Sequence, residues 1–62
     1  MNFITLFDKN IGRYIWVNVD RIIEFSSSLD GKYSVINYGG NDISHVTETP
    51  QEIIAKIIQN EQ

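Results

Sequence analysis

The single histidine of the chain, His45, lies close to two acidic residues, Asp42 and Glu48. Imidazole and carboxylate groups bind metal ions and serve as general acids and bases, so this segment is the first place to look for chemistry. In a strand, successive side chains point to opposite faces, so Asp42 and Glu48 point away from His45, and no nucleophile lies at a useful spacing. We therefore predict that the protein is not an enzyme and binds neither a metal ion nor a cofactor.

A glycine pair, Gly39 and Gly40, is followed by Asn41 and invites comparison with phosphate-binding loops. Those loops place their glycines between a strand and the first turn of a helix, where backbone amides converge on an anion. Here a second strand-like segment follows the glycines. The pair is better interpreted as a hairpin turn, because glycine adopts positive φ without steric cost.

Aromatic residues are the remaining candidates for a functional surface. Tyr14 and Trp16 share one face of a predicted strand, and Tyr38 ends another. Aromatic side chains on a sheet can pack in a core, anchor a protein interface or stack on nucleic-acid bases. We take Tyr14, Trp16 and Tyr38 as the interaction candidates.

Charge favours a protein partner over a nucleic acid. The net charge is −3, the estimated pI is 4.7, and the five basic residues form no run. Lysine and arginine supply much of the affinity for phosphate backbones, so a nucleic-acid partner is disfavoured. A membrane partner is disfavoured as well, because the chain has neither a polybasic patch nor an apolar run of about 20 residues. With no cysteine to form disulfides, we expect a cytoplasmic protein.

These residues must be positioned by short elements, which we expect to form one domain over residues 1–62. Alternating apolar residues separated by turn residues are typical of antiparallel strands. Apolar residues then recur at helical spacing, with Ile53, Ile54, Ile57 and Ile58 in an arc wide enough to cover one face of a sheet. The predicted strands span residues 2–7, 13–19, 22–26, 33–38 and 42–47, and the predicted helix spans residues 50–60.

Two local motifs set element boundaries. Asn18 and Asp20 indicate a tight corner, because such side chains bond to backbone N–H groups two residues on. Thr49, Pro50 and Glu52 indicate a helix start, with Thr49 as the N-cap, Pro50 in the first turn and Glu52 bonding back to the cap.

The expected fold class is α+β: a five-stranded antiparallel meander with the C-terminal helix packed on one face. The sheet can be open and curved, or can form a small, partly open barrel, and the sequence leaves both possibilities. One short helix covers one face, so other apolar side chains need a barrel interior, a second subunit or a partner. A chain of 62 residues has a small core, and pairing of sheet edges between identical chains is a simple way to enlarge it. We therefore expect a homodimer.

Several segments in this order resemble the FlbD-type family of small flagellar proteins and similar short proteins of bacteria and phages. The matching segments are the first strand with Ile4 and Leu6, the corner 17–23, the strand and glycine turn 35–40, and the helix start 46–54. Two loops depart from the family pattern, residues 8–12 and 26–30. The resemblance implies a small non-enzymatic bacterial or phage protein and carries over no catalytic residue.

The sequence thus favours a non-catalytic protein-interaction module that forms homodimers and also binds a protein partner not identified by the sequence. The alternative is a small β-barrel that binds single-stranded nucleic acid through its aromatic residues.

Overall fold

A computed structural model describes residues 2–60 of the chain and contains five strands and one α-helix in that range. The strands and the helix are connected by short turns, and a single turn of 3-10 helix lies between the second and third strands. The elements are β1 (Phe3–Asp8), β2 (Arg13–Asn18), η1 (Val19–Arg21), β3 (Glu24–Ser27), β4 (Ser34–Gly39), β5 (Asp42–Val46) and α1 (Pro50–Asn60).

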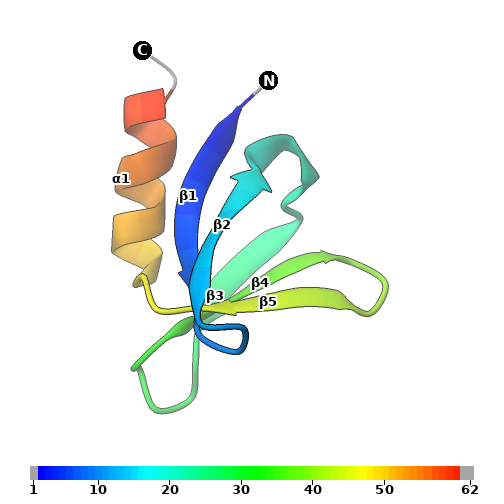
Figure 1. Cartoon of the computed structure of the whole chain (residues 1–62), viewed down its shortest axis with the longest axis vertical. Coiled ribbons are helices and arrows are strands. Elements are labelled where there is room, and N and C mark those ends of the chain that lie inside the picture. The colour runs from blue at the N-terminus through cyan, green and yellow to red at the C-terminus, as the bar shows by residue number, and fades with distance from the viewer. Residues whose placement is uncertain (1, 61–62) are drawn as a thin grey trace.

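The sheet is antiparallel and has the strand order β2-β1-β5-β4-β3. The α+β class with one C-terminal helix on the sheet is therefore confirmed, and the sheet is not closed into a barrel. The order differs from a simple meander at one point: β2 and β3 follow each other in the chain but form the two edges. The β1–β2 hairpin lies beside α1, and the β4–β5 hairpin extends away from α1 at a steep angle to the β1–β2 hairpin (Figure 1).

The corner between β2 and β3 explains this break. The Asn18 side chain accepts a hydrogen bond from the Asp20 N–H at 3.0 Å, as predicted, and caps η1. The Ile22 N–H then bonds to the Val19 carbonyl, and the Ile23 N–H bonds to Asn37 of β4. The chain thus leaves β2 in a tight turn and pairs with β4, so β3 begins at Glu24 rather than at the predicted residue 22.

The glycine pair forms the turn of the β4–β5 hairpin, as predicted. Gly39 has φ of +106° and Gly40 has φ of +59°, which are conformations that favour glycine. A Cβ atom on Gly39 would lie 2.9 Å from Cδ1 of Ile23, an exposed side chain that can move aside, so the positive φ is the stronger reason for glycine here. Both glycines therefore have a structural role.

The helix begins as the sequence predicts. The Thr49 N–H donates to the Glu52 carboxylate at 3.0 Å, and the Glu52 N–H donates to the Thr49 hydroxyl at 3.2 Å. Pro50 is the first helical residue. This reciprocal capping box satisfies two N–H groups at the helix start.

The core lies between the sheet and α1, and the helix contacts β1 and β3. One expectation for the helix is wrong: its four isoleucines do not all cover the sheet. Ile53 is buried and Ile57 packs partly against the core, whereas Ile54 and Ile58 are 47% and 54% exposed, because the narrow sheet receives only one edge of the apolar arc. The buried apolar residues are Ile4, Leu6, Val17, Ile36, Val46 and Ile53.

Polar side chains complete the junction between β1 and β5, which pair through Asp8 and Val46. The Glu48 carboxylate accepts the Phe7 N–H, with its two oxygens at 3.0 and 3.1 Å. From α1, the Lys56 ammonium donates to the Thr5 carbonyl at 2.7 Å. These side chains bind backbone groups of β1 where it diverges from β5.

No helix within residues 2–60 is both long enough and apolar enough to cross a membrane.

Candidate functional site

The exposed aromatic residues gather on the outer face of the β1–β2 hairpin. The register places Thr5 opposite Trp16 and Phe7 opposite Tyr14, and paired residues share a face of the sheet. Phe3 and Phe7 of β1 therefore lie on the same face as Tyr14 and Trp16 of β2. We call these four residues the hairpin aromatic face.

The hairpin aromatic face is open to solvent. Trp16 is 74% exposed and Tyr14 is 64% exposed, while Phe3 and Phe7 are less exposed. The Phe7 and Tyr14 rings meet edge to face, with centroids 5.0 Å apart and an interplanar angle of 85°. The core-packing interpretation of Tyr14 and Trp16 is thus wrong, because the residues of β2 that point inward are Ile15 and Val17.

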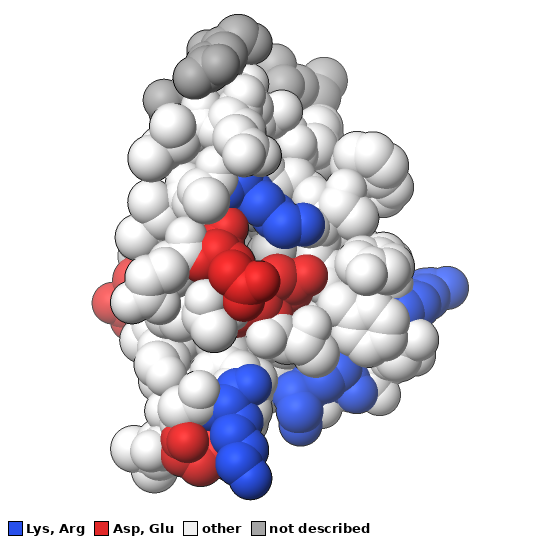
Figure 2. All heavy atoms as spheres, turned by 90° about the vertical axis from the view of Figure 1, so that its left-hand side faces the viewer, with Lys and Arg blue, Asp and Glu red and all other residues white. Residues whose placement is uncertain are grey.

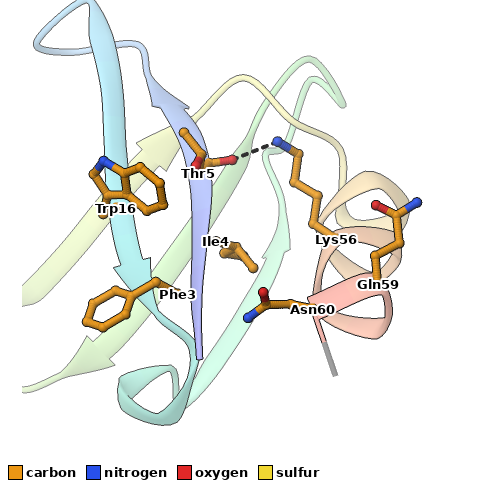
Figure 3. Close-up of a pocket in the computed structure, with 7 residues that line it drawn as sticks. All are labelled: Phe3, Ile4, Thr5, Trp16, Lys56, Gln59 and Asn60. Atoms are coloured by element: carbon orange, nitrogen blue, oxygen red, sulfur yellow. Dashed lines mark hydrogen bonds between the residues drawn. The ribbon is translucent and has the colours of Figure 1, made fainter. Parts of the chain in front are cut away.

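Two shallow grooves flank this face, and Phe3 and Trp16 line both of them. The first, of about 330 Å³, lies between the hairpin and the end of α1, and its helical lining is polar: Lys56, Gln59 and Asn60. Figure 3 shows Phe3 and Trp16 on the strand side of this groove and the three helical residues on the other.

The second groove, of about 350 Å³, lies beside β2 and reaches the tip of the β4–β5 hairpin. It is lined by Trp16 and also by Tyr38, which is half-buried against the core, together with Arg21 and Asp42. The structure thus brings two of the three predicted interaction residues, Trp16 and Tyr38, to one groove. Tyr14 is not in its lining.

His45 belongs to a separate cluster near the β1–β2 turn. Its Nδ1 lies 3.0 Å from the Asn10 side-chain nitrogen, and its ring packs on Tyr33 with centroids 5.6 Å apart. The Lys9 ammonium lies 4.6 Å from the centre of the same tyrosine ring. His45 thus lies beside the Asn10 amide and the Tyr33 ring, and the Lys9 ammonium lies over the same Tyr33 ring.

The acidic neighbours of His45 in the sequence do not join it. Glu48 binds the Phe7 N–H, and Asp42 lines the groove beside β2. Within residues 2–60, no three histidine, aspartate or glutamate side chains form a group suited to a metal ion.

Charges of both signs are interspersed on the helix side of the molecule. Acidic side chains gather near the centre of that face, with basic side chains above and below them (Figure 2). Among the described residues, the basic side chains on this face form no continuous stripe (Figure 2).

Comparisons with known protein families, with curated proteins and with solved structures find no match to this chain. The resemblance to the FlbD-type family stays a prediction.

Sequence reasoning missed two members of the hairpin aromatic face, Phe3 and Phe7. Four residues apart in a strand, they share one face, but a strand that is apolar on both faces is also typical of one covered on both sides. The pairing register shows the missing information, because it aligns them with Tyr14 and Trp16. A sequence signal existed in the matching alternation of the two strands of one hairpin.

Proposed function

We propose that this protein is a non-catalytic interaction module that forms homodimers through the β1–β2 hairpin, which carries the hairpin aromatic face. The observation that carries the proposal is the exposure of Trp16 and Tyr14 on a regular two-stranded hairpin. Tryptophan and tyrosine are enriched among the residues that dominate interface energies. Burial of a large apolar side chain contributes roughly 1.5–3 kcal/mol, so leaving these rings in water forgoes substantial stabilisation.

A second copy of the chain is the partner that we propose first. A domain of 62 residues buries a smaller fraction of its surface than a larger one does, and dimerisation adds buried area without lengthening the chain. Two-fold dimers are also the commonest closed assemblies, and they join identical patches. From the sequence resemblance and the lack of cysteine, we propose a cytoplasmic protein of bacterial or phage type.

Substitution of Trp16 tests this proposal. We expect the wild-type protein to sediment as a dimer at micromolar concentration, and Trp16→Ala to weaken self-association at least tenfold while the far-UV circular dichroism stays native. Leu29→Ala is the matched control, because Leu29 is a fully exposed apolar residue in the loop between β3 and β4 and is not part of the hairpin aromatic face. A wild-type protein that remains monomeric up to millimolar concentration would contradict the proposed homodimer.

The alternative function, binding of single-stranded nucleic acid, is favoured by the same exposed rings on a sheet. Base stacking on such rings contributes about 1–3 kcal/mol per base. The net charge of −3 opposes it. Because Trp16 is the single tryptophan, its fluorescence reports directly on stacking. We expect no quenching by an oligothymidine at low salt, and quenching with micromolar affinity would favour this alternative.

A further inference from the structure

The two edges of the sheet differ in their readiness to pair with another strand. The β3 edge is four residues long, starts with Glu24 and contains two serines, and shortness and charge both discourage pairing. The β2 edge is six residues long, contains neither proline nor glycine, and is rich in aromatic and β-branched residues. Its only charged residue, Arg13, stands at one end. The β2 edge therefore lacks the usual protection.

Hydrogen bonds on β1 show which backbone groups of β2 face outward. Phe7 donates its N–H to Glu48 and accepts the Thr47 N–H, so its backbone groups point away from β2. In an antiparallel pair, the backbone N–H and carbonyl groups of two opposite residues point either toward each other or away from each other. The two cases alternate along the strand. Tyr14, opposite Phe7, thus points its N–H and carbonyl away from β1, as do Trp16 and Asn18.

The odd-numbered residues of β2 should point their backbone groups toward β1, and a hydrogen bond just beyond the strand agrees. The Val19 N–H donates to the Asn2 carbonyl, so odd-numbered residues at this end of the hairpin face β1. The groove of about 350 Å³ also runs along Ile15–Asn18, and Tyr38 and Asp42 border it as well. No strand of the described chain pairs with this edge of β2.

We propose that the β2 edge pairs with the β2 edge of a second copy, antiparallel and centred on Trp16, so that two five-stranded sheets form one continuous sheet. This inference rests on the proposed homodimer and specifies its geometry. In this register Trp16 lies opposite Trp16 of the second copy, and Tyr14 lies opposite Asn18 of the second copy. All three outward-facing residues then exchange backbone hydrogen bonds, which a register shifted by one residue does not allow.

Side chains agree with the same register. The two Trp16 rings become cross-strand neighbours on the outer face, and Ile15 lies opposite Val17 of the second copy on the inner face. Arg13, at the start of one β2, comes next to the end of the other, where Asp20 follows. Arg21 comes directly after Asp20, so each end of the shared ladder carries exposed charges of both signs.

A proline substitution separates edge pairing from packing of aromatic faces. Tyr14→Pro removes an outward N–H that the chain's own ladder does not use, and Tyr14→Ala removes the same ring but keeps the N–H. We expect Tyr14→Pro to weaken self-association at least tenfold more than Tyr14→Ala, by sedimentation, with a native circular dichroism spectrum. Ser27→Pro on the β3 edge is the control and should leave self-association unchanged.

Amide hydrogen exchange of the wild-type protein gives a second test that needs no variant. With rising concentration, protection should increase at least tenfold at Tyr14, Trp16 and Asn18 and stay constant at Phe25 and Ser27 of β3. A dimer whose β2 amides gain no protection overturns the edge pairing but leaves the proposed homodimer standing. A protein that remains monomeric overturns both.

Discussion

At the scale of single residues, Glu48 is a side chain whose role depends on the tertiary structure. Both of its carboxylate oxygens lie within hydrogen-bond distance of the Phe7 N–H, and its own carbonyl accepts the Ser34 hydroxyl at 2.6 Å. Ser34 is fully buried. Glu48 therefore connects β1 to the start of β4 at the point where the β1–β5 ladder is short.

Replacement of Glu48 should destabilise the fold without changing the hairpin aromatic face. Glu48→Ala leaves the half-buried Phe7 N–H without its charged acceptor, and such a bond contributes about 1.5–3 kcal/mol. We expect a loss of that size in the free energy of urea unfolding. Glu48→Gln retains an uncharged acceptor and should lose less. Equal stability of the alanine variant and the wild type would show that water replaces the carboxylate at no cost.

The contrast between Glu48 and Asn18 shows which residue roles a sequence can predict. Asn18, Thr49 and Glu52 bond within three residues of themselves, so their types and spacing are sufficient for prediction. The bond from Phe7 to Glu48 joins residues 41 positions apart, and the bond from Lys56 to Thr5 joins residues 51 apart. No local pattern carries such information. The same reason explains why Trp16 and Tyr38 could be named as candidates but not placed at one groove.

At the scale of elements, the helix start is a local structure with a defined hydrogen-bond pattern and a pH dependence. Two hydrogen bonds lower the pKa of Glu52 below its ordinary value of 4.5. The larger effect comes from the Thr49 backbone N–H, and the smaller one comes from the Thr49 side chain. A carboxyl group whose pKa is lower in the folded state stabilises the fold above the unfolded-state pKa. That stabilisation is lost as the pH falls through the folded-state pKa.

We therefore expect the capping box to weaken below about pH 4.5. Glu52→Gln keeps a capping acceptor that does not titrate, so unfolding free energies of this variant should fall less between pH 6 and pH 3 than those of the wild type. Asp30 titrates in the same direction, because the Ser28 hydroxyl and the Lys32 N–H lower its pKa, so Asp30→Asn should remove a separate part of the acid sensitivity and add to the effect of Glu52→Gln. The same acid sensitivity in Glu52→Gln and the wild type would mean that the Glu52 carboxylate does not contribute.

The elements themselves follow from local signals, but their order in the sheet does not. Alternation and turn residues locate all five strands to within two residues, and the cap locates the helix start. The separation of β2 from β3 depends on how η1 redirects the chain and on the Ile23 bond to Asn37. The exposure of Ile54 and Ile58 likewise depends on the width of the sheet beneath the helix, which a helical wheel does not contain.

At the scale of the whole molecule, a small core and an exposed aromatic face suggest that stability depends on self-association. A partner that binds only the folded state raises the apparent stability by mass action. If that partner is a second copy, the thermal midpoint must rise with protein concentration. A monomer shows no such dependence, so the slope of the midpoint against concentration reports on dimer formation. The measurement needs neither a label nor an immobilised protein.

We expect the wild-type midpoint to rise by several degrees between 5 µM and 500 µM. A hundredfold change in free partner corresponds to about 2.7 kcal/mol for each dimer, and the two chains share this free energy. In a domain of this size, each kcal/mol shifts the midpoint by roughly 4–8 °C. Trp16→Ala and Tyr14→Pro should flatten the dependence, and Leu29→Ala should retain it. Ile54→Ala separates the hairpin from the helix as the dimer surface, because Ile54 is also apolar and 47% exposed. A slope lost in Ile54→Ala and kept in Trp16→Ala would move the interface to α1, because mass action follows whichever surface the second copy covers.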